Sequence, residues 1–125
     1  MGSSLNRVMV IGEVGRPPEM RYMPSGRPVT SFSVGARRSW QDADGETQEE
    51  TEWFSVVAWG ALAERCKADL RQDDQVYVEG RLQTRSWKAD DGTSRFRAEL
   101  VASEMILLNR AHEADAAATD TVTRQ

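Results

Sequence analysis

Residues 51–60, TEWFSVVAWG, constrain the fold more than any other stretch of the chain. Read as a β-strand, this segment turns successive side chains to opposite faces. The two faces are Phe54, Val56 and Ala58 on one side, and Trp53, Ser55, Val57 and Trp59 on the other. The first set predicts a core face. The second places two indoles on one surface, about 20 Å apart along the strand at ~3.3 Å per residue.

Two interpretations of the tryptophan face follow from the residues alone. An exposed aromatic row invites association, and flat aromatic platforms suit stacking against nucleic-acid bases. Alternatively, Trp53 and Trp59 cover a second core, because a barrel strand can be buried on both sides. This stretch does not decide between them.

The length and composition of the chain limit which class of protein it can be. A chain of 125 residues fits one domain with a single hydrophobic core. Its one cysteine, Cys66, cannot form an intramolecular disulfide, and a metal site on it would have only His112 as partner. We therefore expect no metal and no cofactor. No apolar run is long enough for a membrane span and no secretory segment opens the chain, so we expect the cytoplasm.

Charge does not exclude a polyanion as ligand. The formal net charge is -4, which argues against a generic nucleic-acid binder. The acidic residues are concentrated, however, in the segment Asp42–Glu52, which also contains the turn sequence Asp44-Gly45 and predicts a solvated hairpin tip. Arginines lie mostly in the predicted strands, and a binding groove needs only a local positive field.

The order of predicted elements indicates an all-β protein. The strands are expected at Asn6–Val14, Val29–Arg38, Thr51–Gly60, Gln75–Lys88 and Ser94–Leu108, with Glu19–Met23 as a short extended piece. An amphipathic helix, Ala61–Leu70, falls between the third and fourth strands, with Cys66 on its apolar stripe. This pattern is typical of the OB-fold, a five-stranded Greek-key barrel. Gly12 predicts a bulge or barrel corner.

The two ends of the chain differ in what they can bury. Residues 1–108 are expected to form the OB-fold domain. From Asn109 the composition leaves almost nothing to bury, so residues 109–125 are expected to be a flexible tail. Enzyme chemistry is not expected, because the chain has no phosphate loop and its only histidine, His112, lies in this tail.

Five blocks of the sequence, in this order, resemble a known family. They are LNRVMVIGEV, PEMRYMPSG, the W-x-D-x-x-G-E segment, TEWFSVVAWG-x-LAE and VYVEGRLQTRSW. Together they run from about Leu5 to Leu108 and are similar to the bacterial single-stranded DNA-binding proteins, the homotetrameric SSB family. That family has the OB-fold, which agrees with the order of strands.

The resemblance implies a function and a set of site residues. It implies sequence-independent binding and protection of single-stranded DNA in replication, recombination and repair, by a tetramer built as a dimer of dimers at the bacterial nucleoid. Bases would stack on Trp40, Trp53, Trp59 and Trp87, and phosphates would contact Arg37, Arg85, Lys88, Arg95 and Arg71. Subunit contacts would fall on Asn6, Val8, Val10 and Phe54.

The sequence differs from the family pattern in two segments, and two other functions stay open. Arg71-Gln72-Asp73-Asp74 stands where members often carry a glycine, and the chain ends in DTVTRQ, not in an acidic tip with Pro and Phe. Either the sequence is truncated or it is a tail-less relative specialised for coating DNA, and recruitment of replication or repair enzymes is in doubt. An OB-fold protein that binds RNA stays open, because stacking does not separate the two sugars. A primosome-type assembly protein also stays open, although four tryptophans speak against it.

Overall fold

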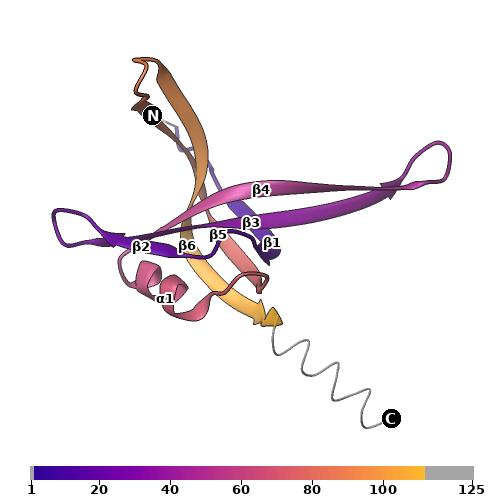
Figure 1. Cartoon of the computed structure of the whole chain (residues 1–125), viewed down its shortest axis with the longest axis horizontal. Coiled ribbons are helices and arrows are strands. Elements are labelled where there is room, and N and C mark those ends of the chain that lie inside the picture. Colours follow the sequence, from indigo (N-terminus) through magenta and orange to yellow (C-terminus); the bar gives the residue numbers. More distant parts are fainter. Residues whose placement is uncertain (1, 112–125) are drawn as a thin grey trace, which may run out of the picture.

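The computed structural model describes residues 2–111; Met1 and residues 112–125, including His112, lie outside the described residues. The elements are β1 (Val8–Val14), β2 (Glu19–Tyr22), β3 (Pro28–Gln41), β4 (Thr47–Trp59), α1 (Ala61–Asp69), β5 (Gln75–Lys88) and β6 (Ser94–Asn109). Figure 1 shows the strands wound around one another, with α1 at one end of the barrel.

Five strands form a closed barrel. The sheet order is β1-β5-β6-β4-β3-β2, and β1 also pairs with β3, which joins the two sides of the sheet. Strand β2 pairs only with β3, as an addition to its edge. The predicted OB-fold is confirmed, and the helix follows the third of the five barrel strands. It lies between β4 and β5 because the short extended piece is itself a strand.

Gly12 allows the barrel to close. Glu13 still pairs with Gln75 of β5, and Glu13 and Val14 also pair with Gly35 and Val34 of β3. A Cβ atom on Gly12 would lie 2.3 Å from the carbonyl oxygen of Gly35, closer than two such atoms can approach. The glycine that the sequence marked as a bulge or corner therefore permits one strand to cross another at close range.

The core is made of the inward side chains of all five barrel strands and is covered by α1. Phe32, Val34, Val56, Val78 and Leu100 are at most 1% exposed. From the helix, Ala63 and Cys66 are fully buried, and the Ala63 carbonyl accepts a 2.7 Å hydrogen bond from the hydroxyl of Thr30. The predicted core face of β4 is confirmed for Val56 and Ala58, and Phe54 packs against it half-buried.

Strand β6 is a single strand in which a bulge shifts the alternation of side chains by one residue. Its pairing with β5 moves from Glu79↔Glu104 to Gly80↔Ala102, which leaves Ser103 without an opposite residue. This bulge lets Leu100 and Met105, which strict alternation would put on opposite faces, both point into the core.

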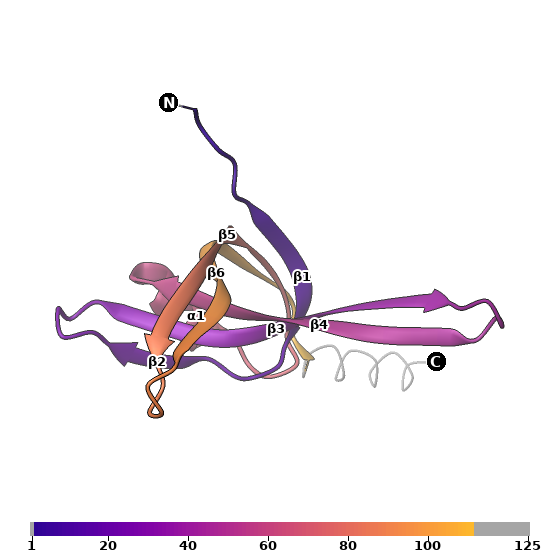
Figure 2. The same ribbon diagram turned by 90° about the horizontal axis from the view of Figure 1, so that it is seen from above.

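Two hairpins extend beyond the barrel. Figures 1 and 2 show the β3–β4 hairpin as a long two-stranded arm and the β5–β6 hairpin leaving in another direction. The carboxylate of Asp42 accepts 2.9 Å hydrogen bonds from the backbone N–H groups of Asp44 and Glu46, which stabilises the tip of the first arm. The backbone N–H of Glu46 is the main reason that the pKa of Asp42 is lowered.

The chain stays attached to the barrel past β6. Asp74 is fully buried and accepts hydrogen bonds from the backbone N–H groups of Arg71 and Ala111, at 2.9 and 3.1 Å. The guanidinium of Arg110 lies 3.8 Å from the same carboxylate. The ordered contacts thus continue to Ala111, three residues beyond the expected domain end at Leu108.

Candidate nucleic-acid interface

One outward face continues across four strands. Val57 of β4 pairs with Val101 of β6, and Trp53 of β4 pairs with Gly35 of β3. Arg85 of β5 pairs with Arg97 of β6. Because side chains alternate along each strand, every second residue of β3, β4 and β5, and of β6 before its bulge at Ser103, lies on this face. The two tryptophans predicted to share a surface, Trp53 and Trp59, are both on it.

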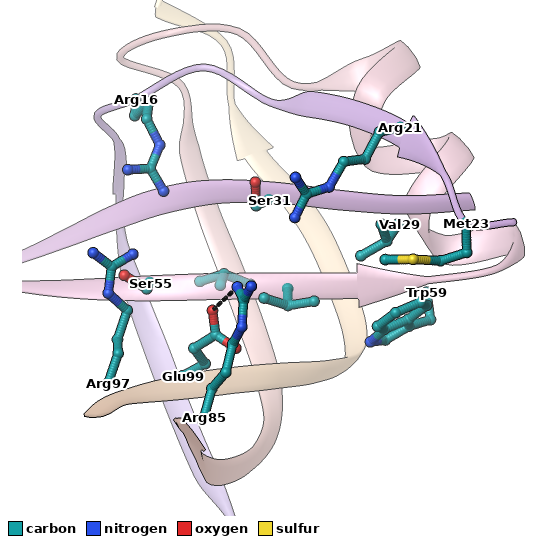
Figure 3. A pocket seen from close by; sticks show the side chains of 12 residues that line it. Arg16, Arg21, Met23, Val29, Ser31, Ser55, Trp59, Arg85, Arg97 and Glu99 are labelled. Carbon is teal, nitrogen blue, oxygen red and sulfur yellow. Dashed lines mark ion pairs between the residues drawn. The ribbon is translucent and has the colours of Figure 1, made fainter. Parts of the chain in front are cut away.

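A hollow of about 440 Å³ lies in this face. Figure 3 shows four guanidinium groups around a floor of small side chains, with an indole and a thioether at one end. The lining residues are Arg16, Arg21, Met23, Val29, Ser31, Ser55, Val56, Val57, Trp59, Arg85, Arg97 and Glu99. The hollow thus combines an apolar aromatic end with a cationic end, the composition that a nucleotide requires.

Trp59 forms the aromatic end of the hollow. It is half-buried, and its cross-strand neighbour on β3 is Val29. The guanidinium carbon of Arg27 lies 4.9 Å from the centre of its ring, within the range of a cation–π interaction. Met23 stands beside the same indole in Figure 3.

Trp87 lies beside the cationic end. The guanidinium carbons of Arg85 and Arg97 are 5.8 and 5.9 Å from its ring centre, and these three residues line a smaller hollow of about 250 Å³. Arg85 and Trp87, two residues apart on β5, therefore lie side by side. Glu99, with a side chain only 13% exposed, lies 3.8 Å from Arg85, and this ion pair is the dashed line in Figure 3.

Trp53 is the most exposed of the four indoles, at 59%. Its six-membered ring lies against the backbone of Gly15 and Gly35, where an added Cβ atom would be 2.4 and 2.8 Å from ring atom Cζ3. Trp53 and Arg37 line another hollow, of about 200 Å³, and Arg37 forms an ion pair with Glu13. Glycine at these positions is what allows the ring to approach the sheet this closely.

The remaining predicted contacts lie on the two arms and in a turn. Trp40 is 39% exposed on the β3–β4 arm, where the guanidinium carbon of Arg38 is 4.5 Å from its ring centre. Lys88 and Arg95 are at the end of the β5–β6 hairpin, and Arg95 lies 3.7 Å from Asp91. Arg71 is exposed in the turn before β5. None of these four residues lines the 440 Å³ hollow.

Four arginines were missed in the choice of candidate residues. Arg16 and Arg21 come from the loop after β1 and from β2, Arg27 precedes β3, and Arg97 lies on β6. For Arg97 a signal existed, because its alternation with Phe96 and Ala98 already placed it on the outward face. Arg16 and Arg21 reach the hollow through the pairing of β2 with β3, and Arg27 lies over Trp59 at its aromatic end; local pattern does not reveal either arrangement.

The four residues expected at a subunit contact mostly face their own barrel. Val10 is 7% exposed in the core, and Phe54 and Val8 are half-buried against it. The side chain of Asn6 donates to the carbonyl and accepts from the N–H of Leu82, at 2.8 and 3.0 Å. The side chains that β1 turns outward are instead Met9 and Ile11, at 64% and 58% exposed.

Within residues 2–111, no cluster of three His, Cys, Asp or Glu side chains is arranged to hold a metal ion. In the same part of the chain, no helix is both long and apolar enough to cross a membrane. Burial raises the pKa of the Cys66 thiol to about 11. The thiol is thus part of the hydrophobic core, as its place on the apolar stripe of the helix predicted.

Comparison with known proteins agrees with the fold. Residues 5–108 match the profile of the single-strand binding protein family. The chain belongs to this family.

Two relatives of this SSB family chain are similar over most of its length. A protein named single-stranded DNA-binding protein 1 from Chlorobaculum tepidum is 43% identical over 109 residues, covering 86% of this chain and 67% of the relative. The single-stranded DNA-binding protein of Neisseria meningitidis serogroup A is 42% identical over 110 residues, covering 88% and 63%. The chain thus spans about two thirds of the length of these relatives.

A solved structure shares the architecture. The chain described as Plasmodium falciparum SSB in complex with single-stranded DNA superposes with a TM-score of 0.80 at 29% identity. The match covers 87% of this chain and 99% of the other. The OB-type barrel of this SSB family member is therefore also that of a solved complex.

Proposed function

We propose that this chain binds single-stranded DNA without sequence preference and protects it during replication, recombination and repair. The observation that carries the proposal is the convergence of Arg16, Arg21, Arg85 and Arg97 with Trp59 around one hollow of about 440 Å³. The printed names of the relatives and of the solved complex point the same way. No enzyme chemistry is part of this proposal.

Stacking supplies the contact to the bases. Trp53, Trp59 and Trp87 lie on or beside one face, and a base stacked on an aromatic ring contributes roughly 1–3 kcal/mol. Every base has a π-face, so sequence has little influence. A duplex hides its base faces between neighbouring pairs, and it should therefore bind poorly.

Guanidinium groups supply the contact to the phosphates. They neutralise backbone charges and release counterions, so the affinity falls as salt rises. The net charge of -4 does not oppose this, because the carboxylates of the β3–β4 arm lie outside the cationic hollow. The local field at the hollow, not the total charge, attracts the strand.

The same proposal includes a homotetramer built as a dimer of dimers. Ile11 of β1 pairs with Tyr77 of β5, which pairs with Ile106 of β6, so that their side chains form an apolar row beside Met9. Ile11 and Ile106 are 58% and 45% exposed. An exposed apolar patch of this kind marks an association surface. Contact through β1 would then use Met9 and Ile11 rather than Val10.

The proposed place of action is the bacterial cytoplasm at the nucleoid. RNA is the competing ligand, since a stacking surface accepts the bases of either polymer.

Binding of fluorescently labelled oligo-dT at two salt concentrations tests the proposal. If four phosphates are neutralised, the slope of log K against log salt is about -3, and affinity falls roughly fifty-fold between ~50 and ~200 mM salt. Mass measured on the same samples should give four copies. A salt-independent affinity, or tighter binding to the matched duplex, would contradict the proposal. An excess of oligo-U that displaces oligo-dT at equal length would favour the RNA interpretation.

A further inference from the structure

Three of the four indoles have an arginine stacked on them. The guanidinium carbon lies 4.5 Å from the ring centre for Arg38 on Trp40, and 4.9 Å for Arg27 on Trp59. Two arginines approach Trp87, at 5.8 and 5.9 Å. A guanidinium over the face of an indole occupies the place that a base would take. These rings are therefore partly covered before any ligand arrives.

Trp53 differs from the other three. Among the described residues, no arginine lies within stacking distance of its ring. It is 59% exposed, against 39% for Trp40 and 40% for Trp87. The edge of its six-membered ring, atoms Cζ3 and Cη2, packs against the backbone of Gly15 and Gly35, which restricts its position. The rest of this exposed indole can stack with a base without displacing an arginine.

An arginine that is stacked on an indole can be displaced by a base. An exposed cation–π contact is weaker than base stacking on an indole, so a base can replace the guanidinium. Each arginine side chain is long and flexible, and the displaced guanidinium remains within reach of the adjacent phosphate. Arg85 is also held by Glu99 at 3.8 Å, so Arg97 is the easier of the two to move from Trp87.

We propose that a single strand first stacks on Trp53, and that the arginines covering Trp40, Trp59 and Trp87 are then exchanged for bases and pass to the phosphates. This inference rests on the proposed function. It assigns Arg27, Arg38 and Arg97 a second role as covers of the stacking rings. It also predicts an order in which the four indoles become occupied.

Four proteins that each retain one tryptophan, with the other three changed to Phe, test the order. The ligand is an oligo-dT of about four nucleotides, the lower end of OB-fold site sizes. The Trp53 protein should be quenched at a concentration at least about threefold lower than the Trp59 and Trp87 proteins. Longer oligo-dT should quench all of them. Equal midpoints for all four with the short ligand would overturn the inference and leave the proposed function standing.

Arg27→Lys tests the exchange itself. Lysine keeps the charge for a phosphate but lacks the planar group that covers Trp59. The midpoint for quenching Trp59 should fall by about two- to fivefold, the ratio that corresponds to an exposed cation–π contact. Trp53 in the same background is the matched control and should not change. A midpoint that stays the same or rises would show that Arg27 only binds phosphate, and would contradict the exchange.

A second readout covers the case in which a reporter protein does not fold. The whole chain labelled with 5-fluorotryptophan gives one fluorine resonance for each indole, and single Trp→Phe changes assign them. The Trp53 resonance should shift first as the short oligo-dT is added. If another resonance shifts first, the order is wrong. If none responds to oligo-dT of any length, the proposed function itself fails.

Discussion

The indole of Trp53 lies against the backbone of Gly35, its cross-strand neighbour, where an added Cβ atom would be 2.8 Å from ring atom Cζ3. A side chain on this glycine has no room unless the ring moves. The most exposed stacking surface of the protein is therefore positioned by the lack of a side chain on the adjacent strand.

Gly35→Ala should weaken binding of oligo-dT by about three- to tenfold, because the added methyl group displaces the ring from its position against the sheet. The obstacle is a side chain at the surface, so the melting temperature should fall by only a few degrees. Gly2→Ala is the control, since nothing lies within 4 Å of that position. Undiminished binding by Gly35→Ala would mean that the orientation of Trp53 is unimportant.

Trp53→Ala should weaken binding of oligo-dT by about fivefold or more, the loss of one stacked base at roughly 1–3 kcal/mol. The domain should still melt cooperatively, because this indole is 59% exposed and contributes little to the core. Binding by anisotropy and thermal melting by circular dichroism measure the two effects separately. Loss of the cooperative melt would support the alternative in which Trp53 covers a second core.

Glu99→Gln should strengthen binding by about two- to fivefold at low salt, because the carboxylate competes with phosphate for Arg85 at 3.8 Å. The slope of log K against log salt should become steeper by about 0.7, the value for one more phosphate on a single strand. Glu104→Gln, at a position paired with Glu79 and outside the hollow, is the matched control. Weaker binding by Glu99→Gln would show that Glu99 mainly positions Arg85.

The thiol of Cys66 should not react with iodoacetamide at pH 8 in the folded protein, since burial raises its pKa to about 11 and the side chain is fully buried. Because the pKa of this thiol in the folded protein lies above the ordinary value of 9.0, the group stabilises the fold below about pH 9. That contribution is lost as the pH rises from about 9 to 11. Alkylation followed by mass spectrometry, with a urea-unfolded sample as control, measures the effect. Rapid labelling of the folded protein would contradict the buried position.

Local pattern predicted the parts of the fold that depend on single strands. Alternation in residues 51–60 placed Val56 and Ala58 inside and Trp53 outside, and all three are where it predicted. The helix with Cys66 on its buried side also followed from spacing alone. These features depend on which side chains share a face, and a sequence states that directly.

Contacts between distant segments could not be predicted in this way. The bulge at Ser103 depends on how β6 pairs with β5, and the crossing at Gly12 depends on where β1 meets β3. For the same reason the sequence did not reveal that Arg16 and Arg21 line a hollow with Arg97. Strand β4 begins at Thr47, earlier than the expected Thr51, because the arm continues pairing with β3 past the barrel.

Intrinsic tryptophan fluorescence during titration with oligo-dT tests most directly whether these indoles receive bases. We predict strong quenching that saturates with single-stranded oligo-dT and little change with the matched duplex at the same nucleotide concentration. An emission spectrum that stays unchanged at saturating oligo-dT would contradict the account.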